Sequence, residues 1–129
     1  MVIRTIIWAV LAAVVFVNGS YAAEDINQQM RTLAADRGCM LCHDFQPTTA
    51  AGGQVLPMAP SWREIAMRYK SDSNAEERLT NTVLNGIGTR LGERHWAGKV
   101  STVGMFSNTR EIDPHEAQAL VHWILSLEK

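Results

Sequence analysis

Apolar side chains recur at helical spacing in four parts of the chain. The first is formed by Ile26, Met30, Leu33 and Ala34, which follow an i, i+4, i+7, i+8 pattern. This spacing puts them on one face of a helix, and we predict that the helix runs into Gly38.

A second helix is predicted after Ser61, because Glu64 follows it at the spacing of a capping box. Its apolar face contains Trp62, Ile65, Ala66 and Tyr69. Ser73 and Glu76 repeat the capping pattern and predict a third helix, which should end at Gly86 or Gly88. Its inward positions are Leu79, Val83 and Ile87.

The last helix has the clearest start. Asp113 is in the cap position, Pro114 takes the first helical position and Glu116 completes a capping box. The apolar stripe that follows comprises Ala117, Leu120, Val121, Ile124 and Leu125, with Trp123 flanking it.

The segments between these helices are predicted loops. Residues 46–60 are rich in Pro, Gly, Thr and Ala, and residues 88–112 are long and irregular. Long loops in compact domains are usually functional. Because no segment shows a strand pattern, the sequence predicts an all-α fold.

Length and charge narrow the possibilities. A chain of 129 residues suits one small domain, and a formal net charge of −1 gives no reason to expect a nucleic-acid partner. Residues 1–22 have Arg4 near the start, an apolar run over 6–17 and the ending Ser20-Tyr21-Ala22, as in a signal peptide. The alternative, an uncleaved anchor, would need about 20 apolar residues. We predict cleavage after Ala22, with 23–129 as the exported domain.

The two cysteines form the pattern Cys39-Met40-Leu41-Cys42-His43, the C-x-x-C-H motif of covalent haem attachment. Two thiols three positions apart on a helical turn can reach the two vinyl groups of a porphyrin. The adjacent imidazole of His43 is then carried under the iron. The motif therefore predicts one covalent haem and one iron ligand.

A C-x-x-C pair is also found in disulfides and in zinc sites. A disulfide in a thioredoxin-like protein would place C-x-x-C beside a β-α-β pattern, which is lacking. A zinc site would need further ligands from His95, His115 or His122. Neither reading explains why a histidine follows the second cysteine.

With these motifs, residues 26–129 resemble the class I cytochromes c, especially the small periplasmic mono-haem proteins of bacteria. The marks of the resemblance, besides the haem motif, are Gly38, Ala59-Pro60, Asn85-Gly86, Trp96, Met105 and the ending EAQALVHWILSL. The resemblance implies four to five short helices wrapped around one covalently attached haem c.

The resemblance also implies roles for single residues. Cys39 and Cys42 would bind the haem and His43 its iron, while the Pro60 carbonyl would accept a hydrogen bond from that imidazole. Met105 would be the second iron ligand, and the indole N–H of Trp96 would bind a propionate. The haem-binding set is thus Cys39, Cys42, His43, Pro60, Trp96 and Met105, with His43 and Met105 on the metal.

Alternatives to Met105 remain open at this point. Met58 follows a proline, as the ligand methionine of the family often does, but it lies two residues before Pro60 and would have to cross the ring. His95 would give a bis-histidine iron. The segment from Gly88 to Val103 is also longer than in the smallest family members, and its cations could face propionates or an acidic partner. These cations are Arg90, Arg94 and Lys99.

Two protein ligands would leave iron no open position, so the resemblance implies an electron carrier that cycles between Fe(II) and Fe(III). Its partners would be a redox donor and a redox acceptor in the periplasm, and after signal cleavage no membrane span should remain. The alternatives are a haem subunit held stably by a periplasmic dehydrogenase or oxidase, and an enzyme or gas sensor with an open iron site.

Overall fold

The computed structural model describes residues 22–47, 56–87, 96–101, 104–107 and 111–128. The predicted signal peptide lies outside these ranges except for Ala22. The chain divides into two compact units, Met1–Thr32 and Leu33–Lys129. In the first unit, residues 22–32 are helical, and the Gln29 side chain donates to the Asp25 carboxylate at 2.9 Å.

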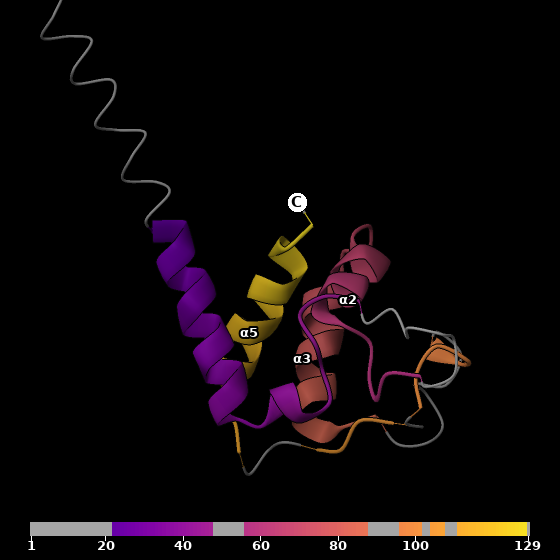
Figure 1. The fold of residues 1–129 in the computed structure, drawn as a ribbon. Coiled ribbons are helices and arrows are strands. Elements are labelled where there is room, and N and C mark those ends of the chain that lie inside the picture. Colours follow the sequence, from indigo (N-terminus) through magenta and orange to yellow (C-terminus); the bar gives the residue numbers. More distant parts are fainter. Residues whose placement is uncertain (1–21, 48–55, 88–95, 102–103, 108–110, 129) are drawn as a thin grey trace, which may run out of the picture. The chain divides into compact units, whose positions relative to one another are not determined.

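In the second unit residues 33–36 are helical, and Figure 1 shows the other elements. These are the short 3-10 helix η1 (Cys39–Leu41) and the α-helices α2 (Trp62–Tyr69), α3 (Ala75–Asn85) and α5 (Pro114–Ser126). Helix α5 packs against both α3 and α2. The described residues include no strand, and the prediction of an all-α fold is confirmed.

Both predicted capping boxes at α2 and α5 are confirmed. At α2 the Ser61 hydroxyl accepts a hydrogen bond from the Glu64 N–H, and the Glu64 carboxylate accepts from the Ser61 N–H at 2.9 Å. Asp113 and Glu116 form the same reciprocal pair at α5, with Pro114 in the first helical position. These local bonds satisfy backbone donors that a helix start leaves without partners.

The predicted capping box at α3 is wrong. The cap position is Asn74, whose side chain makes no capping hydrogen bond, so Ser73 lies outside the helix. The carboxylate of Asp72 instead accepts from the Asn74 N–H at 2.9 Å. An Asp that bonds two residues ahead offers the backbone a turn in place of the expected cap.

The predicted end of α3 at Gly86 is confirmed, but the predicted helical position of Ile87 is wrong. Gly86 has φ of +74° and its N–H donates to the Thr82 carbonyl at 2.8 Å, which ends the helix at Asn85. A positive φ costs a glycine little, and glycine is the usual residue for this position. Ile87 therefore lies beyond the helix, where it is free to face another part of the unit.

An aromatic cluster forms the centre of the second unit. The rings of Trp62 and Trp123 meet edge to face with centroids 5.3 Å apart, and Phe45 lies 6.4 Å from the first and 6.2 Å from the second. Trp123 is only 4% exposed, so the buried face of α5 is wider than the predicted apolar stripe and includes the residue that flanks it. The cluster joins α2 and α5 to the segment after His43.

Candidate cofactor site

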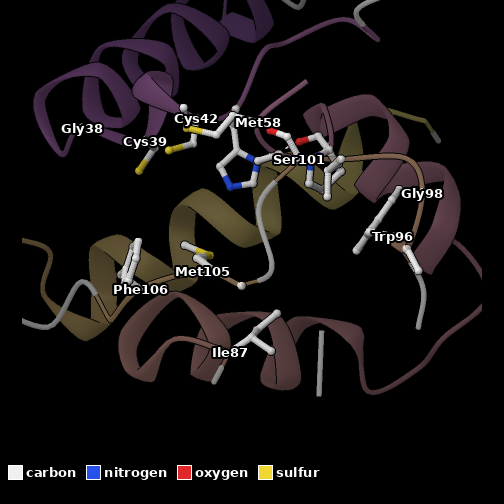
Figure 2. Close-up of a pocket in the computed structure, with 16 residues that line it drawn as sticks. Gly38, Cys39, Cys42, Met58, Ile87, Trp96, Gly98, Ser101, Met105 and Phe106 are labelled. Carbon is white, nitrogen blue, oxygen red and sulfur yellow. Dashed lines mark hydrogen bonds between the residues drawn. The ribbon is translucent and has the colours of Figure 1, made fainter. Parts of the chain in front are cut away.

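Five segments line a cavity of about 380 Å³ in the second unit. They are the Cys-containing turn, residues 58–60, Ile87 just after α3, the segment around Trp96, and residues 104–106. Figure 2 shows Cys39 and Cys42 at one edge of the cavity, Ile87 at the opposite edge and Met105 between them. The volume lies within the roughly 300–1,000 Å³ that is usual for ligand and cofactor pockets.

The turn with the two cysteines begins at Gly38, which has φ of +72°. The chain then forms η1, and the His43 N–H donates to the Cys39 carbonyl at 3.0 Å. Both thiols are free and both residues line the cavity, Cys39 half-buried and Cys42 exposed. Burial raises the pKa of the Cys39 thiol, which keeps it protonated near neutral pH.

The imidazole of His43 has a defined orientation. Its Nδ1 lies 2.8 Å from the carbonyl oxygen of Pro60. A carbonyl oxygen can only accept, so Nδ1 carries the proton and Nε2 keeps its lone pair. Burial lowers the pKa of His43, against the opposing effect of the Pro60 bond, and favours the neutral ring that ligates metals.

The residues after His43 are fastened to α2. The Trp62 N–H donates to the Asp44 carbonyl at 3.0 Å, and Phe45 inserts its ring into the aromatic cluster. The guanidinium of Arg63 lies 5.6 Å from the centroid of the Phe45 ring. These contacts fix the backbone beside His43, so the ring is held by more than its own hydrogen bond.

The residues before Cys39 are fastened to α5. Arg37 donates from Nε to one carboxylate oxygen of Glu116 at 3.0 Å and from Nη2 to the other at 2.6 Å. A two-point Arg–carboxylate bond fixes orientation as well as distance. The Cys-containing turn is therefore attached to the helical frame at both ends.

The hydrogen bonds of Glu116 and Asp113 predict that the free energy of unfolding falls at acid pH. The Arg37 bond lowers the pKa of Glu116, and backbone N–H groups of α5, first that of Glu116, lower the pKa of Asp113. Both groups bind protons more tightly in the unfolded chain, so their stabilisation is present above pH of about 4 and is lost as the pH falls through the lowered folded values.

We expect Glu116→Gln to flatten the decline of unfolding free energy between pH of about 5 and 3, because it removes one of these carboxyls. Denaturant unfolding of the holoprotein at several pH values measures this decline. Glu77→Gln, at an exposed position in the first turn of α3, is the control. An unchanged slope in Glu116→Gln would contradict the prediction.

Two methionines line the cavity. Met58 is 53% exposed and lies two residues from Pro60, whereas Met105 is half-buried in the segment 104–107. The Met58 backbone is thus tied by two peptide units to the carbonyl that holds His43. Met105 reaches the cavity from a separate segment of the chain.

Trp96 also lines the cavity and is half-buried. The ammonium of Lys99 lies 6.0 Å from the centroid of its ring. Close to it, the Ser101 N–H donates to the Pro57 carbonyl at 2.8 Å, which joins two of the lining segments. The predicted propionate bond of Trp96 stays a prediction.

The other candidate residues from the sequence lie away from the cavity or outside the described residues. His95, Arg90 and Arg94 fall outside the described residues. His115 and His122 are exposed on α5, and His122 pairs with Glu76 at 2.9 Å. Among the described residues, no group of three or more His, Cys, Asp or Glu side chains is placed to hold a metal ion.

The sequence did not predict several of the lining residues, among them Ile87 and Phe106. Ile87 is predicted on the inner face of α3, but the helix ends two residues earlier, at Asn85, and Ile87 lines the cavity instead. Gly86 was the available signal, because a residue after a glycine cap is released from the helix face. Phe106, 87% exposed at the rim, had no such signal.

The residues present suit the haem that the sequence predicts. The cavity brings together two free thiols, one imidazole nitrogen with a free lone pair and two thioethers. Its other walls are mostly small or apolar side chains, among them Ile87, Trp96 and Val100. Thiols for covalent bonds, nitrogen and sulfur for iron, and apolar walls for a macrocycle are the donor set of a haem c site.

Comparison with known proteins agrees with this chemistry. The family model described as cytochrome c matches residues 29–128. Cytochrome c-551 of Allochromatium vinosum is 28% identical over 95 residues, which cover 74% of this chain and 82% of that protein.

Two solved structures have a similar fold. Cytochrome c552 of Nitrosomonas europaea matches with a TM-score of 0.55 and 23% identity, over 75% of this chain and 98% of that one. The class 1 cytochrome MtoD of Sideroxydans lithotrophicus ES-1 matches with a TM-score of 0.53 and 22% identity, over 78% and 94%. Within the described part of the chain, no helix has the length and apolar character to cross a membrane.

Proposed function

Because the chain belongs to the cytochrome c family, we propose that it is a periplasmic carrier with a single haem, whose iron is ligated by His43 and Met105. The observation that carries the proposal is the cavity in which Cys39, Cys42, His43 and Met105 meet. As a family member the chain binds haem c covalently and transfers electrons without catalysing a reaction of its own.

The bound haem would supply one reversible electron through its iron. Two thioether bonds from Cys39 and Cys42 would hold it at the turn. His43 keeps its proton on Nδ1 through the Pro60 carbonyl, which aims Nε2 and makes it a stronger donor. A sulfur ligand from Met105 and the apolar walls both favour the less charged ferrous state and raise the potential.

The predicted signal peptide supports the proposed periplasmic location. Residues 1–22 have the charge, apolar core and small-residue ending of a signal peptide, and covalent haem attachment is proposed for the exported residues 23–129. Mass spectrometry of the mature protein should find Ala23 at the amino terminus. An intact Met1 on the haem-bearing chain would contradict this part of the proposal.

We propose that the carrier works as a monomer that meets a redox donor and a redox acceptor in turn. Electron-transfer encounters use small interfaces, below about 1,200 Å². Sedimentation of the exported protein at micromolar concentration should give the mass of one chain. A second chain that co-purifies and sediments with it would instead favour a fixed subunit of a dehydrogenase or oxidase.

The proposed ligation of iron by both His43 and Met105 predicts that carbon monoxide cannot bind to the native protein. The ferrous protein is expected to show no change in its absorption spectrum under carbon monoxide at neutral pH, because Met105 occupies the position that the gas would need. Denaturant should allow binding, since it releases the methionine. A carbon monoxide spectrum formed within seconds by the native protein would point to an open site and a sensing or enzymatic role.

A further inference from the structure

The segment with Met105 is attached directly to the end of α3. The Ile87 N–H donates to the Met105 carbonyl at 2.8 Å, and the Ser107 hydroxyl donates to the Leu84 carbonyl at 2.6 Å. One bond thus fixes the Met105 peptide itself, and the other fixes the chain two residues later. We call the contacts of Leu84, Gly86 and Ile87 with Met105 and Ser107 the α3 clasp.

Gly86 allows these two bonds to form together. A Cβ atom at this position would lie 2.6 Å from the Met105 carbonyl oxygen and 2.8 Å from the Ser107 nitrogen. Both distances are shorter than real Cβ contacts, and both neighbours are backbone atoms that cannot rotate away. With φ of +74°, Gly86 also has a conformation that a residue with a side chain rarely adopts.

Helix α3, which forms one side of the α3 clasp, is packed into the second unit. Helix α3 packs on α5, and its Ala75 and Val83 are buried. The Gly86 N–H closes the helix on the Thr82 carbonyl at 2.8 Å. A segment fastened to this helix end takes its position from the helical frame.

We propose that Gly86 and Ser107 are positioning residues that hold the Met105 thioether at the iron and so keep external ligands out. This inference rests on the proposed ligation by Met105 and adds what maintains it. Neither residue needs to touch iron, because each acts on the Met105 backbone. Loss of either contact shifts the balance toward a state in which the methionine has left the iron.

The test is competition by imidazole for the oxidised holoprotein, read together with the weak far-red band that reports sulfur ligation. Ser107→Ala should raise the apparent imidazole affinity about fivefold, as expected for one lost hydrogen bond. Gly86→Ala should raise it at least about tenfold and weaken the band, because the new methyl group displaces the Met105 peptide.

Ser126→Ala is the matched control. The Ser126 hydroxyl also donates to a helix carbonyl, that of Trp123, at 2.6 Å, but it lies at the end of α5 and lines no part of the cavity. Its imidazole affinity should stay within about twofold of wild type, a change smaller than one hydrogen bond gives. The Ser107 variant keeps the test decisive should Gly86→Ala not fold.

The possible failures are distinguishable. A wild-type protein without the sulfur band would overturn ligation by Met105 itself. If the band is present and is lost in Met105→Ala, but Ser107→Ala and Gly86→Ala lose only thermal stability and keep wild-type imidazole affinity, the clasp is merely structural. The positioning role is then rejected while the proposed function stands.

Discussion

Replacing Cys39 and Cys42 together by alanine is expected to abolish haem that survives denaturation of the chain. The sequence has no other cysteine, so no third thiol can replace either bond. The cavity would also lose its anchor for the macrocycle and leave apolar walls such as Ile87 and Val100 facing water or a void. Haem staining after denaturing electrophoresis should fall to background, and the melting temperature should fall sharply.

Leu41→Ala is the control for this experiment. Leu41 lies in η1 between the two cysteines but is 82% exposed, so its removal changes the turn without touching the thiols. It should keep full haem staining. Haem that remains with the denatured double variant would show that the chain attaches it elsewhere and would overturn the assignment of the motif.

Met105→Ala is expected to remove the far-red sulfur band of the oxidised protein and to lower its reduction potential by on the order of 0.1 V. Axial ligands set haem potentials over a range of about 0.8 V, and loss of a thioether removes a ligand that favours ferrous iron. The same variant should bind carbon monoxide in the native state. Spectra and a redox titration measure all three effects.

Met58→Ala separates the two candidate ligands. Both methionines line the cavity, but the Met58 backbone is two residues from the carbonyl that accepts the His43 hydrogen bond. We therefore expect Met58→Ala to keep the band and most of the potential. Loss of the band in Met58→Ala, with retention in Met105→Ala, would reverse the ligand assignment.

Local signals in the sequence predicted local structure well. The boxes at Ser61 and Asp113 start α2 and α5 as expected, because a cap depends on neighbours three residues apart. The same reasoning failed at Ser73, where the Asp72 carboxylate accepts from the Asn74 N–H and the helix begins after Asn74 without a side-chain cap. Composition of a turn does not decide which polar side chain takes the cap.

Tertiary features escaped prediction for a different reason. Periodicity predicts Trp123 at the flank of the apolar stripe, but it does not predict its burial, which depends on the rings of Phe45 and Trp62 from other segments. The bond between Arg37 and Glu116 joins residues 79 positions apart, and no repeat or spacing in the sequence predicts it. The C-x-x-C-H motif predicts covalent haem attachment. The contacts that orient His43 and fix the Cys-containing turn depend on the folded chain and are not visible in the motif.

The approach of Gly86 to Met105 bears on the speed of electron exchange. An electron moves only when the surrounding nuclei reach positions that suit both charge states, and a preorganised site needs little such rearrangement. Movement of the Met105 peptide toward α3 meets the backbone of Gly86, and movement away breaks the Ile87 bond. If Met105 is the iron ligand, as proposed, a peptide confined in both directions should let it change little between oxidation states, so we expect a small reorganisation energy and rapid self-exchange.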